Sequence, residues 1–135
     1  MRRLKIGVLA VAAAAFAAFA ISADAIEPMP PIPEDLLEQI HNQPRDECEP
    51  VSDTLARQDF WRAYPQRALE GGIQGWVVMR VVVATDGRVT SVTPVQAAPA
   101  GVFEDASAHV VARVRFPALP VECTRLTLIQ FRQAQ

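Results

Sequence analysis

The sequence lacks the groups on which most enzymes depend. Its only histidines, His41 and His109, stand far apart and beside no cluster of possible metal ligands. It has no G-x-S-x-G motif and no phosphate-binding loop. Cys48 lies among three acidic residues, whose negative charges disfavour a reactive thiolate. We therefore expect no catalytic activity, no metal site and no cofactor.

A surplus of positive charge is also missing. The whole chain has 13 basic and 15 acidic residues. Without residues 1–25, ten basic residues face fourteen acidic ones. A protein that binds nucleic acid needs basic side chains to neutralise the phosphates, so this balance argues against a nucleic-acid partner.

Only one long apolar run is present, and it lies at the N-terminus. Three basic residues precede an uncharged, alanine-rich run over residues 6–21, and small residues follow as far as Ala25. This order is typical of a secretory signal peptide, with cleavage predicted after Ala25. The alternative is an uncleaved anchor, although sixteen residues fall short of the ~20 that a membrane span needs. Contact with a membrane is expected only in that case.

The chain has only two cysteines, Cys48 and Cys123. An even number of cysteines in an exported chain favours a disulfide bond, because the compartment is oxidising. The alternative is a pair of buried free thiols, which behave as small apolar side chains.

What the chain does have is a valine-rich stretch, residues 75–95, that predicts a β-hairpin. Its first part is apolar at every second position, at Val77, Met79, Val81 and Val83. That period indicates a strand with one face on a core. Asp86 and Gly87 mark the turn. A three-residue loop that ends at Gly87 buries both Val83 and Val89, whereas a two-residue loop turns Val89 outward. We therefore predict the longer loop, with Gly87 in the left-handed region.

The second strand of the hairpin is irregular. Val89 and Val92 are three residues apart and would lie on opposite faces of a plain strand. A β-bulge near Thr90 and Ser91 would return Val92 to the core face. Pro94 has no N–H group, so its part of the strand must lie at an edge or a bulge.

The remaining segments predict the fold class. Apolar residues at helical spacing indicate helices over residues 34–41, from Ser52 or Asp53 to 63, over 65–70 and over 102–115, and a last strand spans 124–132. The order predicts an α+β fold: a small three-stranded antiparallel sheet with two packed helices. A Pro-rich and partly helical N-terminal extension, residues 26–63, precedes this domain of residues 64–135.

At this point the sequence resembles the C-terminal domain family of TonB. The resemblance covers Tyr64 to Phe131. It is carried by Tyr64-Pro65, Ala68, Gly75, the alternating series from Val77 to Val83, Asp86-Gly87, Val89, Val92, Phe103, Ala106, Arg115-Phe116 and Leu119. The resemblance implies a periplasmic domain without catalytic activity, and a three-stranded antiparallel sheet with two helices. It also implies binding of an extended segment of an outer-membrane receptor, by addition of a strand to the sheet.

Three features depart from the energy transducers of that family. The apolar run ends in a cleavage signal, the Pro-rich arm is short, and the two cysteines are additional. The expected function is therefore a periplasmic peptide- or protein-binding module that acts in outer-membrane transport. The alternatives are a disulfide-stapled structural domain that self-associates as a homodimer, and a short membrane-anchored transducer.

The predicted strand order, 2-1-3, leaves the last strand at an edge of the sheet. Strand addition there uses backbone groups, and side chains select the peptide. We predict that the peptide-binding residues are Arg125, Leu128, Gln130 and Arg132. The alternative is that Arg125 and Arg132 protect the edge against pairing with other chains.

One apolar row is left over on the outer face of the first strand, at Trp76, Val78 and Val82. An apolar patch of this kind needs a cover. We predict that the disulfide holds the extension against the sheet and that Leu55, Phe60 and Trp61 help to cover the row.

Overall fold

The computed structural model describes residues 25–134. The predicted signal peptide, except for Ala25, lies outside these residues. The elements are α1 (Glu34–His41), α2 (Glu49–Ala56), the 3₁₀ turn η1 (Trp61–Ala63), α3 (Gln66–Glu70), β1 (Gly75–Val83), β2 (Val89–Ala98), α4 (Glu104–Val111) and β3 (Cys123–Phe131). Within this part of the chain, no helix has the length and apolar character needed to cross a membrane.

The three strands form one antiparallel sheet in the order β2-β1-β3, as predicted. Val83 pairs with Val89, and Gly87 has a φ of 85°, so the predicted loop length is confirmed. The register shifts by one residue between Val82 and Val83, which leaves Thr90 as the extra residue of the expected bulge. A second shift lies beside Pro94. Bulges and a missing N–H group thus keep the β2 edge irregular.

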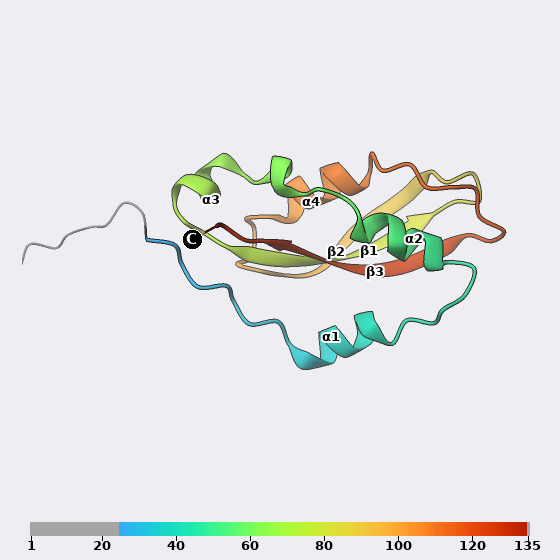
Figure 1. Ribbon diagram of the computed structural model, residues 1–135, viewed down its shortest axis with the longest axis horizontal. Helices are drawn as coiled ribbons and strands as arrows, with labels where there is room; N and C mark the ends of the chain where they lie inside the picture. The colour runs from blue at the N-terminus through green and yellow to red at the C-terminus, as the bar shows by residue number, and fades with distance from the viewer. Residues whose placement is uncertain (1–24, 135) are drawn as a thin grey trace, which may run out of the picture.

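The main core lies between one face of the sheet and the helices α2, α3 and α4 (Figure 1). The alternating residues of β1 and the inward face of α2 are fully buried there. At one end, Phe103 stacks on Phe131 with ring centroids 4.6 Å apart, and Tyr64 meets both rings edge-on. Paired aromatic rings of this kind stabilise a core beyond the area they bury.

The second helix of the extension differs from its prediction. It begins at Glu49 and ends at Ala56, so Ser52 and Asp53 lie inside it and cap nothing. Pro50 stands in the first turn, where a missing N–H group is harmless. The helix near the C-terminus is also shorter than predicted, because its regular part spans only Glu104–Val111.

The outer face of β1 is covered by a different segment from the one predicted. Trp76 and Val78 are buried with Leu36 of α1, and the side chains packed around them include Met29, Ile32 and Ile40. Figure 1 shows α1 on the side of the sheet opposite α2, α3 and α4. Leu55 and Phe60 belong to the main core instead, and Trp61 is 54% exposed. The prediction was right that the extension covers this face but wrong about the residues.

The extension is fastened to the domain along its length. Near its start, the Glu27 N–H donates to the Gly72 carbonyl over 2.8 Å, and the Gln74 side chain donates to the Glu27 carbonyl over 3.0 Å. Farther along, the Trp76 indole N–H donates to the Pro30 carbonyl over 3.1 Å. Near its end, Cys48 is joined to Cys123 by the disulfide bond. Residues 27–56 therefore pack on the domain and do not form a free arm.

Candidate functional site: the free edge of β3

The outer edge of β3 carries backbone groups that point away from the sheet. The Leu126 N–H donates to Gln43 Oε1 over 2.7 Å, and the Leu126 carbonyl accepts from Gln43 Nε2 over 2.8 Å. Both backbone groups of Leu126 thus face away from β1. Because this orientation alternates along an antiparallel strand, the backbone groups of Leu128 and Gln130 also face outward. Within residues 25–134, no group outside the sheet bonds to them.

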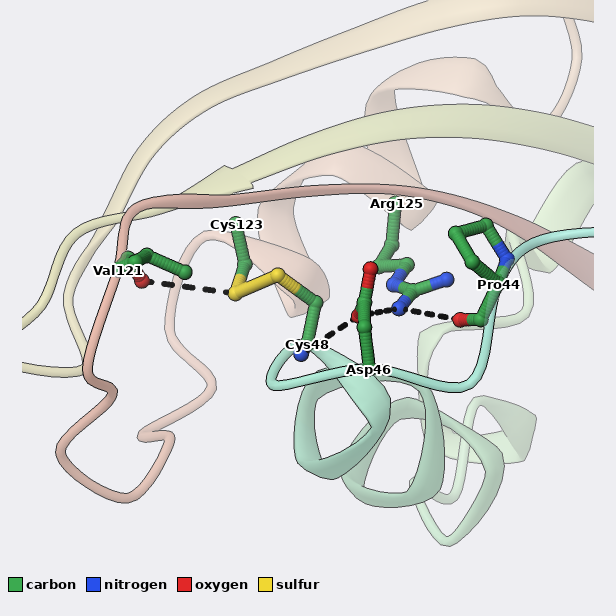
Figure 2. The surroundings of a disulfide bond; sticks show 6 residues. All are labelled: Pro44, Asp46, Cys48, Val121, Cys123 and Arg125. Atoms are coloured by element: carbon green, nitrogen blue, oxygen red, sulfur yellow. Dashed lines mark hydrogen bonds and ion pairs between the residues drawn. A yellow bond between two sulfur atoms is a disulfide. The ribbon is translucent and has the colours of Figure 1, made fainter.

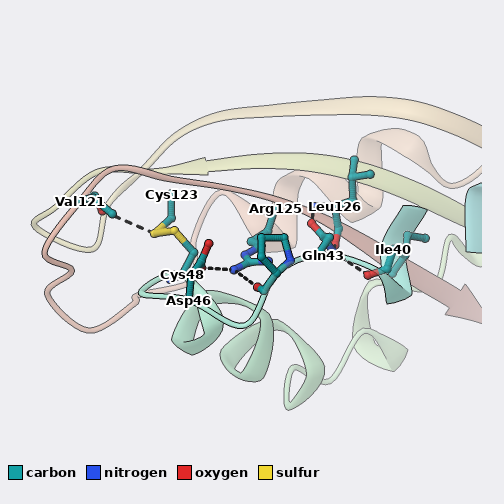
Figure 3. A network of polar contacts seen from close by, with 9 residues as sticks. Ile40, Gln43, Asp46, Cys48, Val121, Cys123, Arg125 and Leu126 are labelled. Atoms are coloured by element: carbon teal, nitrogen blue, oxygen red, sulfur yellow. Dashed lines mark hydrogen bonds and ion pairs between the residues drawn. A yellow bond between two sulfur atoms is a disulfide. The ribbon is translucent and has the colours of Figure 1, made fainter. Parts of the chain in front are cut away.

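The N-terminal end of this edge is closed. Figure 2 shows the guanidinium of Arg125 directed at Asp46 and the Pro44 carbonyl, beside the disulfide. Figure 3 adds Gln43, which joins Leu126 to the end of α1 through the Ile40 carbonyl. The loop between α1 and α2 therefore occupies the edge as far as Leu126. A strand added to β3 can pair only beyond that residue.

A groove with a volume of about 460 Å³ runs along the free edge. We call it the β3 groove. Residues 125–130 of β3 form its floor, α1 forms one wall and α2 the other. The wall residues are Leu37, Ile40 and His41 of α1, and Glu49, Ser52, Asp53, Leu55 and Ala56 of α2. The two helices lie on opposite faces of the sheet, so an added strand would have a wall against each of its faces.

The groove continues past the C-terminal end of β3. A second hollow beside it is lined by residues 58–61, Tyr64 and residues 130–132. Gln58, Phe60 and Gln130 belong to both hollows, so the two form one path along the strand. The exposed ring of Trp61 lies at this open end. An exposed aromatic ring beside an unpaired strand edge is well suited to contact with a partner.

The structure separates the four residues that were predicted to bind a peptide. Leu128 and Gln130 lie on the groove floor, and Arg132 lies at the open end, where its Nε–H donates to Gln130 Oε1 over 2.8 Å. Arg125 is only 3% exposed and holds the extension through Asp46 and Pro44. Its Nε–H has no acceptor among the described residues. Arg125 thus stabilises the closed end and does not stand free on the edge.

Sequence reasoning missed two parts of this site. It did not assign a role to Gln43, which takes the place of a paired strand at Leu126. It also did not place α1 against the edge, although Leu37 and Ile40 were part of a predicted amphipathic helix. The only sequence signal was that helix's apolar spacing, which does not say what the helix packs against.

No group of three or more possible metal ligands lies together in residues 25–134. Burial raises the pKa of Tyr64 above its usual value, and a hydrogen bond from Gln133 partly opposes that shift. The Tyr64 hydroxyl donates to the Ile73 carbonyl and accepts from Gln133 over 3.2 Å. This tyrosine joins the segment between α3 and β1 to Gln133 after β3, which is a structural role.

A comparison with models of protein families identifies the family of this chain. Residues 62–132 match the family model described as the Gram-negative bacterial TonB protein C-terminal. The chain belongs to the TonB C-terminal family. No curated protein matches the chain. Domains of this family are non-catalytic, face the periplasm and bind outer-membrane receptors. The matched residues include β3, whereas α1 and α2 lie before the match.

Proposed function

We propose that this protein is a periplasmic binding module that recognises an extended peptide segment by strand addition to β3. The segment would belong to a protein partner, such as an outer-membrane receptor, because the family binds such receptors. The observation that carries the proposal is the free backbone of Leu128 and Gln130 on the floor of the β3 groove. Backbone pairing at such an edge supplies affinity, and the surrounding walls supply selectivity.

The other edge of the sheet supports this choice by contrast. β2 has two register shifts and contains Pro94, which offers no N–H group. Bulges and prolines are the features by which proteins keep an edge strand from pairing. β3 pairs with β1 without a shift from Cys123 to Phe131, so its outer edge has the regular spacing that an added strand needs.

The packing of the extension bears on energy transduction. An arm that reaches across the periplasm must be free of the domain. Here the segment from Glu27 to Ala56 is bonded to Gly72, packed on Trp76 and joined to Cys123. We therefore propose a binding function in outer-membrane transport and assign no mechanical role to this segment.

Proline substitutions on the free edge test the proposal. Proline at position 130 or 128 removes an outward N–H donor and leaves the ladder to β1 intact. The full chain, exported from cells with a photoreactive residue at Gln58, is expected to form partner cross-links in the native envelope. Gln130→Pro and Leu128→Pro should abolish these cross-links, and the matched variants Gln130→Ala and Leu128→Ala should keep them.

The controls separate binding from folding. A photoreactive residue at Arg113, which lines a hollow away from β3, should give no cross-link that depends on these prolines. The urea midpoints of the proline variants establish that the domain is folded. Cross-links that survive both prolines in folded protein would show that the edge is not the binding site. A cross-linked product that is a dimer of this chain would favour self-association through β3 in place of a receptor.

A further inference from the structure

The walls of the β3 groove belong to the extension, and the extension is strongly acidic. Residues 26–59 contain nine acidic and two basic residues. Glu49 and Asp53 line the groove from α2, four residues apart and therefore on the same side of the helix. Within residues 25–134 neither forms an ion pair. The wall formed by α2 thus presents unpaired negative charge to whatever lies on β3.

The basic residues that line the groove lie at its ends. Arg45 lies between Pro44 and Asp46, which both hold Arg125. Arg45 therefore stands at the closed end of the groove, as does His41. Arg125 itself is paired with Asp46. Arg132 lies at the open end, bonded to Gln130. No basic residue therefore lines the middle of the groove beside Asp53, since Arg57 at the end of α2 is not part of the lining.

The pleat of β3 determines which residues of an added strand meet each wall. Ile129 packs in the main core on the side of α2, whereas Leu128 packs with Leu36 on the side of α1. Side chains of directly paired residues lie on the same face of a sheet. The residue paired with Leu128 would therefore point at Leu37 and Ile40 of α1. Its two neighbours would point at α2 and its acidic residues.

We propose that the β3 groove selects an extended segment in which an apolar residue is flanked by two basic residues. The apolar side chain lies against α1, and the basic side chains lie on the side of α2, whose wall carries Asp53 in the groove and Glu49 toward its closed end. The selection is made by the extension and not by the part of the chain that matches the family. This inference rests on the proposed strand addition, since the alternation of side chains requires a paired strand.

Three fluorescent peptides test the selection on the full exported protein. They have the sequences Ser-Lys-Val-Lys-Ser, Ser-Ser-Val-Ser-Ser and Ser-Glu-Val-Glu-Ser, and binding is followed by anisotropy at low salt. The basic peptide should bind about tenfold or more tightly than the acidic one, because like charges across an interface disfavour binding. High salt should reduce this ratio toward one, since exposed charges are screened.

Charge variants test whether the acidic residues of α2 cause the preference for basic peptides. The double variant Glu49→Gln with Asp53→Asn should bring the affinities for the basic and acidic peptides together. The matched double variant Asp105→Asn with Glu122→Gln removes the same charge at exposed positions outside the groove and should leave the ratio unchanged. An equal change in both double variants would mean that net charge, and not the wall of α2, sets the preference, which overturns the proposal.

The outcomes distinguish strand addition on β3 from the selection of basic residues. If Gln130→Pro abolishes binding of every peptide but basic and acidic peptides bind equally well, strand addition holds and the selection fails. If Gln130→Pro leaves binding unchanged, or no peptide binds at all, strand addition on β3 fails and the selection fails with it.

Discussion

Gln43 occupies the outer edge of β3 by bonding to both backbone groups of Leu126. The donor and the acceptor of one side-chain amide replace the two bonds that a paired strand would make, at 2.8 and 2.7 Å. The same side chain also donates to the Ile40 carbonyl over 3.1 Å. A single residue thus closes the strand edge and fastens the end of α1 to the sheet.

Replacing Gln43 should weaken the closed end in a graded way. Gln43→Ala leaves the Leu126 N–H and carbonyl without partners, which we expect to cost about 1–2 kcal/mol of unfolding free energy. Gln43→Glu keeps an acceptor for the N–H but loses the donor, so it should fall between wild type and alanine at neutral pH. Urea unfolding measures both. Gln39→Ala, at an exposed position of α1, is the control, and an equal loss there would show that the loss of any glutamine side chain in this region, and not edge pairing, is responsible.

Gly87 and Gly101 allow backbone strain to be separated from crowding. Both have positive φ values, 85° and 81°. A Cβ at Gly87 would lie 2.1 Å from the Phe116 carbonyl oxygen, whereas a Cβ at Gly101 would meet nothing within 4 Å. Gly101→Ala should therefore cost about 1 kcal/mol for the backbone conformation alone.

Gly87→Ala should cost at least ~1 kcal/mol more than Gly101→Ala, because the hairpin and the segment at Phe116 must move apart. Gly87→Val should cost more again, since a β-branched residue fits the left-handed region poorly. Urea midpoints of the three variants give the order. Equal values for Gly87→Ala and Gly101→Ala would show that the segment at Phe116 moves away from the added Cβ without a measurable cost in stability.

The raised pKa of Tyr64 predicts that the folded protein loses stability at alkaline pH. Burial raises its pKa, so the folded state favours the neutral phenol. The contribution to stability is complete below the usual tyrosine pKa of about 10 and decreases as the pH rises through that value toward the raised one. The chain has one tyrosine, so ultraviolet absorbance follows its ionisation without interference. The titration midpoint should lie above that of the urea-unfolded protein.

Tyr64→Phe should remove this part of the alkaline dependence. At neutral pH the variant loses the hydroxyl bonds to Ile73 and Gln133 and should be destabilised by about 1–2 kcal/mol. A titration midpoint equal to that of the unfolded chain would mean that the hydroxyl is open to water.

The sequence predicted those features that depend on local patterns. The period of two in β1, the turn glycine and the three-residue separation of Val89 and Val92 each restrict the hairpin to one register, and the structure has that register. The strand order followed from the density of apolar residues on β1, which is buried on both faces. These signals are contained in short stretches of chain, so no distant partner is needed to interpret them.

The parts that were missed depend on partners far apart in the chain. Leu36 and Leu55 belong to two short helices that each bury one side, yet they pack on opposite faces of the sheet. Nothing in their spacing assigns a face. The burial of Arg125 likewise depends on Asp46, 79 residues away in sequence. A charge on a strand is expected to be exposed unless its partner is known.

Removal of the disulfide is expected to affect both the stability of the fold and the α2 wall of the groove. Cys48 is the residue before α2, and Cys123 begins β3, 75 positions later in sequence. Replacing both with serine frees the unfolded chain from this loop, and we expect a loss of about 2–4 kcal/mol in urea unfolding. The wall formed by α2 then remains fastened at its start mainly by Arg125, Asp46 and Pro44.

Adding Asp46→Asn to the double serine variant removes the charge that pairs with Arg125. The start of α2 should then open before the sheet unfolds, because α2 is held only by the packing of Val51 and Leu55, whereas β1 is paired on both sides. Hydrogen exchange should show faster exchange over residues 49–56 while residues 75–83 of β1 stay protected. Asp46→Asn with the disulfide intact is the control. If α2 and β1 lose protection together in the triple variant, the extension and the sheet unfold as one unit, and the disulfide is not what holds the groove wall in place.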